Sequence, residues 1–247
     1  MPRNFTYNVL TLRVRASGES NREAWFLSSE EGIFKATVFG GPKSKLRSQV
    51  APFHQGKIWI YHDPVRDSRK VTDFDVQKWR PGLRELYERT ITADSLAETV
   101  LATHAGGGNW NIALKLAADT LDCLEKSDEK TCPRILLQFF LAWTDFLGVR
   151  PGLNQCASCA CEAGTDGVLW YSVQEGSLFC GKCRSEPDIT VGPGARRWLL
   201  SVAGLEPKDA LRFSLDNVSL QQAGALALNI LAQSLGKHLP LWDYLNF

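Results

Sequence analysis

Apolar and polar residues alternate in several short runs within the first 80 residues, which is the period-two pattern of half-buried β-strands. In the first run, at residues 5–15, Leu10, Leu12 and Val14 are predicted to share one face of a strand. Four further runs follow at residues 23–27, 32–40, 57–62 and 70–76. Five short antiparallel strands suit a small barrel. We expect an OB-fold, the five-stranded barrel that commonly binds oligonucleotides, and an SH3-like barrel fits almost as well.

After residue 82 the apolar residues recur at intervals of three and four, as in helices that bury one face. This spacing predicts helices over residues 83–90, 93–105, 109–126 and 133–148. Thr92 or Asp94 is a suitable N-cap for the second helix, and Gly148 is a suitable stop for the fourth. The three glycines at 106–108 are expected to connect two helices. They have no strand before them and no Lys-Ser or Lys-Thr after them, as a phosphate-binding loop requires.

Two Cys-x-x-Cys pairs carry the most specific chemical signal, and 20 residues separate them. The pairs are Cys156 with Cys159 and Cys180 with Cys183. Two such pairs at this distance predict a tetrahedral zinc site in a zinc ribbon. Because all four expected ligands are thiolates, the site is expected to be closed and structural rather than catalytic.

Two alternatives to this assignment remain open. The cysteines could form disulfides, although a cytosolic protein keeps its thiols reduced. Cys161 lies two residues beyond Cys159 and could compete as a ligand.

The charge of the chain is unevenly distributed. The formal net charge is +1, but residues 1–80 contain 14 Lys and Arg against 8 Asp and Glu. Clustered positive charge on one domain indicates a polyanionic partner, since binding of phosphates releases condensed counterions. A solvated charged surface is the competing interpretation.

Residues 40–53, the basic segment, concentrate this charge. The segment reads GGPKSKLRSQVAPF and contains Lys43, Lys45 and Arg47 with no acidic residue. We expect these alternate cations to follow a sugar-phosphate backbone without reading sequence. Three further cations could extend the track: Lys35, Arg13 and Arg15. The aromatic residues Trp25, Trp59 and Tyr61 could stack on bases, although some of them are expected to fill the barrel core.

The sequence does not favour an enzyme or a membrane protein. Its four histidines are scattered, without an accompanying metal-binding or nucleophile motif. No run approaches the ~18 apolar residues of a membrane span, and no secretory signal is recognised. We therefore expect a cytoplasmic binding protein.

Three stretches resemble the RecO family of bacterial recombination mediators. The first covers residues 10–53, with its two turns and a Gly, basic, Ser-rich loop that leads to Pro-Phe. The second, FLGVRPGLNQCASC, joins a helix end to the first cysteine pair, and the third, LNILAQSLGKHLPLWDYL, resembles the closing helix and tail of the family. The tail departs from the family pattern in having Leu-Trp after Pro240.

The resemblance implies a non-enzymatic DNA repair and recombination mediator of the RecFOR pathway. Members of the family bind single- and double-stranded DNA, anneal complementary strands and help the recombinase replace single-strand-binding protein. The implied partners are DNA, RecR and the acidic tail of single-strand-binding protein, and the implied location is cytoplasmic and nucleoid-associated. Some members have lost the cysteines, so the intact set here indicates that one structural Zn²⁺ is retained.

These observations predict an α+β multidomain protein in four parts. An OB-fold DNA-binding barrel at 1–80 precedes a helical domain at 81–150, an inserted four-cysteine zinc-ribbon module at 151–190, and C-terminal helices at 191–247 that pack with the helical domain. Two other functions remain open. One is an RNA- or transcription-associated module, which would prefer RNA or bind polymerase, and the other is a scaffold that contacts only proteins.

Overall fold

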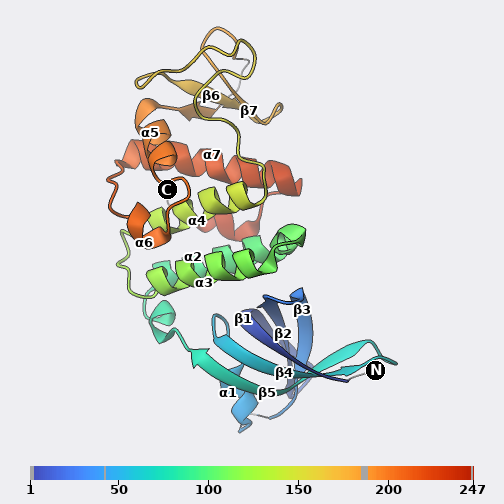
Figure 1. Cartoon of the computed structure of the whole chain (residues 1–247). Coiled ribbons are helices and arrows are strands. Elements are labelled where there is room, and N and C mark those ends of the chain that lie inside the picture. The colour runs from blue at the N-terminus through green and yellow to red at the C-terminus, as the bar shows by residue number, and fades with distance from the viewer. Residues whose placement is uncertain (1–2, 42, 185–188, 246) are drawn as a thin grey trace. The chain divides into compact units, whose positions relative to one another are not determined.

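The alternating runs form five strands that close into a barrel in the computed structural model (Figure 1). The strands are β1 (Asn4–Ser17), β2 (Asn21–Ser28), β3 (Gly32–Val38), β4 (Gln55–Asp63) and β5 (Ser68–Lys78). Their order around the barrel is β1-β2-β3-β5-β4, with β3 and β5 paired in parallel at Thr37 and Lys70 and the other neighbours antiparallel. This closed five-strand arrangement is OB-like, which confirms the predicted fold class.

The structure describes residues 3–41, 43–184, 189–245 and 247. The chain divides into two compact units, residues 1–126 and residues 127–247. The first contains the barrel with helices α2 and α3, and the second contains α4 and everything after it. The boundary falls inside the range 81–150, which the sequence grouped as one helical domain, and the division into four parts remains a prediction.

A β-bulge in β1 changes the predicted faces of this strand. The pairing with β2 shifts register between Thr11 and Arg13. As a result Val14 packs against the barrel core, whereas Leu10 and Leu12 are buried outside that core, where α2 and α3 contact β1. The expectation that these three apolar residues share one face was wrong, because one extra residue reverses the alternation.

The barrel core contains phenylalanines and aliphatic residues, and none of the three expected base-stacking aromatics. Phe26, Phe34 and Phe74 are buried in it, with Phe26 in contact with both other rings. Trp25 and Trp59 alternate with core residues along β2 and β4, so both lie on the outer surface, and Tyr61 is also only half-buried. All three aromatics therefore remain available on the surface of the barrel.

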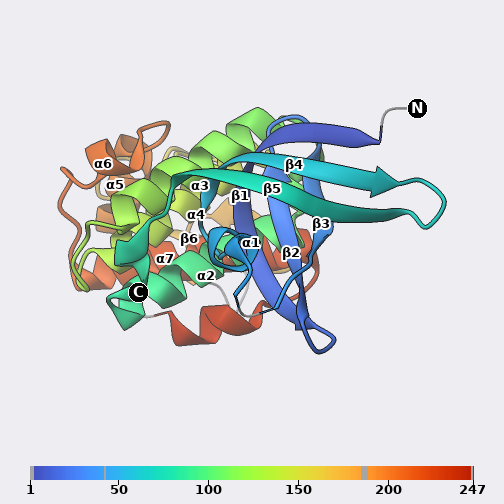
Figure 2. The same ribbon diagram turned by 90° about the horizontal axis from the view of Figure 1, so that it is seen from below.

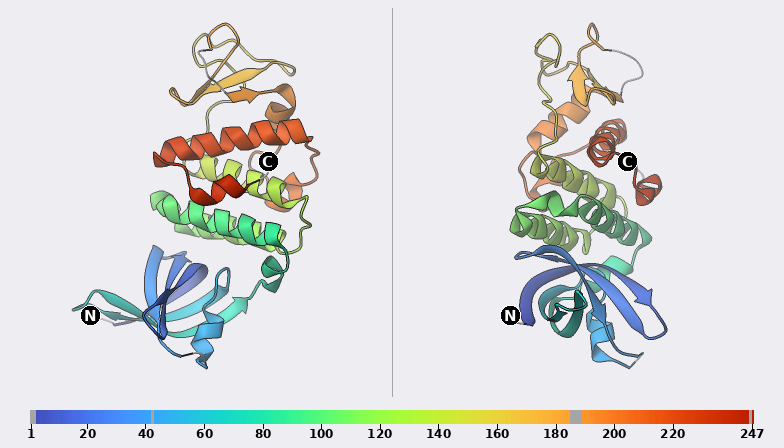
Figure 3. Two further views of the ribbon diagram at one scale, coloured as in Figure 1. Left: turned by 180° about the vertical axis from the view of Figure 1, so that it is seen from behind. Right: turned by 90° about the vertical axis from the view of Figure 1, so that its right-hand side faces the viewer.

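Two helices complete the first unit, α2 (Tyr87–Ala102) and α3 (Trp110–Leu124), which lie side by side (Figure 3). A short 3-10 turn, η1 (Pro81–Arg84), precedes α2, and a second, η2 (His104–Gly107), joins the two helices through glycines of positive φ. Helix α2 runs without a break through Thr92 and Asp94. The predicted start of a separate helix at these residues was therefore wrong.

The second unit is built on two long helices, α4 (Cys132–Phe146) and α7 (Asn217–Leu235), which pack together. Two shorter helices and a 3-10 turn accompany them: α5 (Pro193–Ser201), α6 (Pro207–Ala210) and η3 (Pro240–Tyr244). As predicted, α4 ends just before Gly148, whose φ is +70°. Trp242 is 2% exposed and contacts the Phe140 ring, so the tryptophan of the unusual Leu-Trp contributes to this core.

The cysteine-rich region forms a small antiparallel sheet with the strand order β7-β6-β8. Strand β6 (Leu169–Ser172) pairs with β7 (Ser177–Phe179) and with β8 (Ile189–Val191). Strand β6 thus lies between the two cysteine pairs, as expected for a zinc ribbon. Among the described residues, no helix is both long and apolar enough to span a membrane.

Candidate metal centre and nucleic-acid interface

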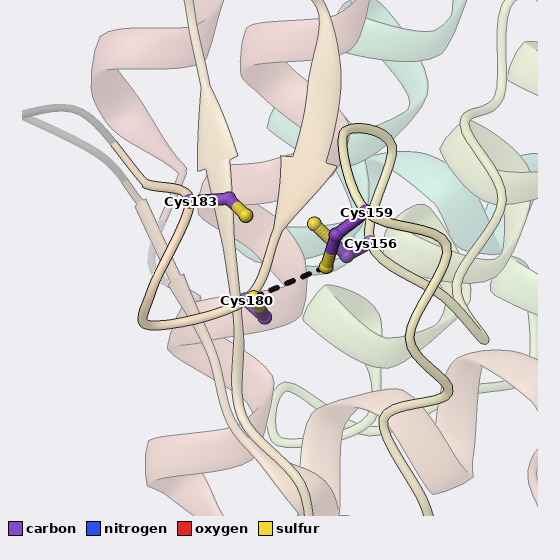
Figure 4. A group of neighbouring side chains, drawn as sticks. All are labelled: Cys156, Cys159, Cys180 and Cys183. Carbon is purple, nitrogen blue, oxygen red and sulfur yellow. Dashed lines mark hydrogen bonds between the residues drawn. The ribbon is translucent and has the colours of Figure 1, made fainter.

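The two Cys-x-x-Cys pairs come together as predicted (Figure 4). The Sγ atoms of Cys156, Cys159, Cys180 and Cys183 all lie within 4.8 Å of one another. The Sγ atoms of Cys159 and Cys180 are 3.8 Å apart, which equals the edge of a tetrahedron with metal–sulfur bonds of about 2.3 Å. The four cysteines could therefore hold one metal ion.

Each cysteine pair lies in a tight backbone turn. The N–H of Ala160 donates to the carbonyl of Cys156, and the N–H groups of Cys183 and Arg184 donate to the carbonyl of Cys180. A bridge between Gln155 and Glu162 closes the first turn at its base. Such turns bring both sulfurs of a pair to one side of the backbone, which is why the short spacing suits metal binding.

The electrostatics of the four sulfurs favour a bound cation. Hydrogen bonds from the backbone N–H groups of Cys159 and Cys180 lower the pKa of Cys156 to about 6. In contrast, the neighbouring Cys159 side chain raises the pKa of Cys183 to about 11. Four crowded thiols cannot all ionise by themselves, whereas a divalent cation would stabilise all four thiolates.

Cys161 lies beside this cluster without belonging to the group of four. Its thiol interacts with Cys159 and Cys180, and these interactions raise its pKa to about 12. The four sulfurs that converge are those of the two Cys-x-x-Cys pairs, as their spacing predicts.

The basic segment forms a short helix, α1 (Lys45–Gln49), after a turn that contains Lys43 (Figure 2). Leu46 packs against the barrel core, which fixes this helix on the barrel. Lys45 and Arg47 are two positions apart and therefore point to different sides of α1. Lys43 and Lys45 are exposed, whereas Arg47 is half-buried.

Two side chains satisfy carbonyl groups at the end of α1. Arg22 Nη1 donates to the Arg47 carbonyl at 3.3 Å. His54 Nδ1 lies 2.7 Å from the Gln49 carbonyl and donates to it when Nδ1 carries the proton. These bonds connect α1 to β2 and to the start of β4, since carbonyls at a helix end need external partners.

On the outer face of the barrel, two of the predicted cations lie against Trp25. The guanidinium of Arg15 is 5.8 Å and the ammonium of Lys35 is 5.9 Å from the centre of the Trp25 ring. Arg15 comes from β1, Trp25 from β2 and Lys35 from β3, so the pairing of three strands assembles this Trp25 cluster. Lys35 also forms an ion pair with Glu23 at 2.9 Å.

A second aromatic and cation pair follows on the same sheet, and the sequence did not single it out. Phe39, directly after β3, is 45% exposed, and the Lys70 ammonium lies 5.3 Å from the centre of its ring. Lys70 reaches this position because β5 pairs in parallel with β3 at Thr37. The alternation of β3 extends to Phe39 and could have identified it, but the strand order that brings Lys70 alongside could not be read from the sequence.

Arg13 differs from the other predicted DNA-binding residues. It is half-buried and lies close to Asp94 of α2, where burial raises the pKa of the Asp94 carboxyl and the Arg13 charge opposes that rise. Arg13 also pairs with Trp25 across β1 and β2, so it lies beside the Trp25 cluster as well. The DNA-binding role expected for Arg13 remains a prediction.

The chain combines an OB-like barrel, which carries an aromatic and cationic face, with a four-cysteine centre. These features place it in the class of multidomain OB-fold proteins. The family described as Recombination protein O N terminal matches residues 1–77, and Recombination protein O C terminal matches residues 84–243. The chain belongs to the RecO family, which confirms the resemblance drawn from the sequence.

Several curated proteins share this similarity over most of their length. The DNA repair protein RecO of Nitratidesulfovibrio vulgaris is 28% identical over 223 residues, which cover 88% of this chain and 84% of that protein. The DNA repair protein RecO of Heliobacterium modesticaldum is 26% identical and covers 91% and 82%, respectively. That of Solidesulfovibrio magneticus is 26% identical over 73% of both chains.

Proposed function

We propose that the protein is a DNA repair and homologous recombination mediator. It binds single- and double-stranded DNA, anneals complementary strands, and helps load the strand-exchange recombinase onto DNA coated by single-strand-binding protein. The observation that carries this proposal is the position of Trp25 between Arg15 and Lys35 on the outer face of an OB-like barrel. An aromatic ring can stack on any base, and flanking cations bind the adjacent phosphates, so such a surface binds single strands without reading their sequence.

The DNA path extends from the Trp25 cluster to the basic segment. Phe39 and Lys70 provide a second aromatic and cationic contact, and Phe39 leads directly into the turn with Lys43. Lys45 and Arg47 on α1 contribute positive charge on two sides of this helix. Cations on different sides suit a flexible single strand that wraps around α1 better than a straight row of phosphates.

The metal of the four-cysteine centre is Zn²⁺, and its role is structural. Four thiolates in a tetrahedron match the preference of zinc and leave no position for a catalytic water. The ion would hold together the two turns of a region with little regular structure, in which β6 has only four residues. The protein acts by binding and not by catalysis.

The proposed partners besides DNA are RecR and the acidic C-terminal tail of single-strand-binding protein, and the proposed location is cytoplasmic and nucleoid-associated. These follow from membership of the RecO family. We also propose four functional parts at 1–80, 81–150, 151–190 and 191–247, with the barrel as the part that binds DNA.

The proposal is tested by annealing of complementary single strands precoated with single-strand-binding protein. The wild type is compared with a variant in which Lys43, Lys45 and Arg47 are all replaced by Ala. A matched control replaces three exposed cations of the second unit, Lys208, Arg212 and Lys237, and so removes the same charge elsewhere. We expect the first variant to anneal poorly and the control to anneal like the wild type.

Other outcomes would change the proposal in distinct ways. If both variants anneal as well as the wild type, the DNA path lies away from the basic segment. If both lose activity equally, the effect is one of total charge. If the folded wild type does not anneal coated strands at all, the mediator function is wrong, and binding to RNA is then compared with binding to DNA.

A further inference from the structure

A pocket of about 390 Å³ opens in the second unit between α5 and the loop around the first cysteine pair. Neither the metal centre nor the proposed DNA path uses it. The residues that matter for its chemistry are Asn154, Glu162, Thr165, Arg196, Arg197 and Leu200.

Arg196 is held in this pocket by an unusual set of partners. It is 3% exposed, and its Nε donates to the Leu153 carbonyl at 2.9 Å. Its Nη1 donates to the carbonyls of Gly164 at 3.1 Å and Gly167 at 2.7 Å. Three carbonyl groups thus fix the guanidinium rigidly, but they bring no negative charge.

The third guanidinium nitrogen remains available. Nη2 has no hydrogen-bond partner among the described residues, and it is not one of the polar atoms that are sealed from solvent. Arg196 lines the pocket, and no described residue competes with a ligand for its Nη2. A buried guanidinium is costly without an anion, so this open position favours a negatively charged ligand.

Neighbouring side chains complete a polar site. Arg197, the next residue on α5, has a 63% exposed side chain and lies only at 3.9 Å from Asp166, a loose pairing that leaves the cation able to turn toward a ligand. Thr165 and Asn154 supply neutral donors from the opposite loop. Glu162 also lines the pocket and works against a second negative charge, which favours a group of single negative charge.

We propose that this pocket binds a phosphate group, with Arg196 Nη2 and the Arg197 guanidinium as its charged donors. A phosphate has enough oxygens to accept from both arginines and from Thr165, and charge-assisted bonds to guanidinium are the strongest of this kind. The exposed Leu200 side chain gives the pocket an apolar wall that suits the organic part of a phosphate ester. The phosphate comes either from a nucleic-acid backbone or from free phosphate.

The test is an NMR titration of the full, metal-loaded chain with inorganic phosphate, following the Arg196 Nε–Hε and Thr165 amide signals. We expect saturable shifts of both signals. Arg197→Gln removes an exposed donor without disturbing the buried carbonyl contacts, and it should weaken binding about five- to tenfold. Arg212→Gln removes a more exposed arginine just after α6, and binding should stay unchanged.

A second titration with a short single-stranded oligodeoxynucleotide that lacks terminal phosphates identifies the source. If it shifts the same two signals, and inorganic phosphate competes, backbone phosphates occupy the pocket. If only inorganic phosphate shifts them, the pocket takes free phosphate, and the Trp25 indole signal reports separately whether the barrel binds the strand. The proposal is overturned if tens of millimolar phosphate produce no saturable shift, or if Arg197→Gln and Arg212→Gln weaken binding equally.

Discussion

The ammonium group of Lys35 lies 5.9 Å from the centre of the Trp25 ring, on the outer face of the barrel. A second tryptophan of the outer face, Trp59, has a similar neighbour, since Lys57 lies 5.7 Å from the centre of its ring. Their surroundings differ, because Trp59 pairs with Asp73 and Lys57 pairs with Asp75 on β5. These carboxylates repel phosphates. The Trp25 cluster has one neighbouring carboxylate, Glu23, which is paired with Lys35, and it has a second cation in Arg15.

We therefore expect Trp25→Ala to weaken binding of single-stranded DNA about 5- to 100-fold, as for the loss of a base-stacking ring. Trp59→Ala, the matched control, should change the affinity by less than about threefold. Fluorescence anisotropy of a labelled oligonucleotide at fixed salt measures both. Equal effects of the two substitutions would show that the Trp25 cluster has no special role.

Removal of the metal should destabilise the second unit. We expect one Zn²⁺ per chain, lost on Cys156→Ser or Cys180→Ser, together with a decrease of about 4 kcal/mol or more in the free energy of unfolding. Cys161→Ser is the control, and it should retain the metal because this sulfur is outside the converging four. Metal analysis and thermal unfolding test this. Loss of zinc in the Cys161 variant would instead make that residue a ligand.

Arg80 and Asp122 should form a stabilising pair within the first unit. Arg80 is buried, and its Nε donates to Asp122 Oδ1 at 2.6 Å, while its other nitrogens bind the Phe53 carbonyl and Gln55. We expect Asp122→Asn to cost about 2–4 kcal/mol near neutral pH, since it leaves the Arg80 charge without its carboxylate. Asp119→Asn, in a more exposed pair with Lys115 on the same helix, should cost less than about 1 kcal/mol.

The effect of Asp122→Asn should depend on pH. Burial raises the pKa of Asp122, but Lys78 and Arg80 together outweigh this effect and hold it below its ordinary value. A lowered carboxyl pKa contributes stability above the unfolded value of about 3.9 and loses it as the pH falls through the folded value. The difference between wild type and variant, measured by urea unfolding, should therefore shrink below about pH 4. A constant difference would contradict the assigned charge.

His54 should make the barrel sensitive to mild acid. Burial, with the nearby charges of Arg84 and Arg80, lowers its pKa, although the Gln49 carbonyl opposes this. A histidine with a lowered folded pKa contributes full stability above its unfolded pKa of about 6.5. The stability then falls as the pH drops below that value toward the folded pKa. We expect His54→Gln to reduce the slope of melting temperature against pH in this window, with His238→Gln, on the exposed tail, as control.

Local periodicity predicted the five strands and most of the helical segments between residues 83 and 148 correctly, and the spacing of the cysteines predicted their convergence. Periodicity failed at one β-bulge and at one helix start. The bulge between Thr11 and Arg13 placed Val14 on the core side of β1 and left Leu10 and Leu12 outside the barrel core. Helix α2 continued through Thr92 and Asp94, because the gain from packing a continuous helix outweighed the capping tendency of these residues.

By itself, then, the sequence determined the five strands, the RecO resemblance and the two Cys-x-x-Cys pairs, while the type of barrel and a role for Cys161 stayed open. These depend on local periodicity, on the short spacing within each cysteine pair and on stretches of matching residues. Only the tertiary structure decided which cations meet which partners: Arg15 and Lys35 at Trp25, Lys70 at Phe39, Arg13 near Asp94, and Arg196 among three carbonyls. Each of these contacts joins different strands, helices or loops of the fold. Their formation depends on strand order, register and burial, and none of these is encoded in the neighbourhood of a single residue.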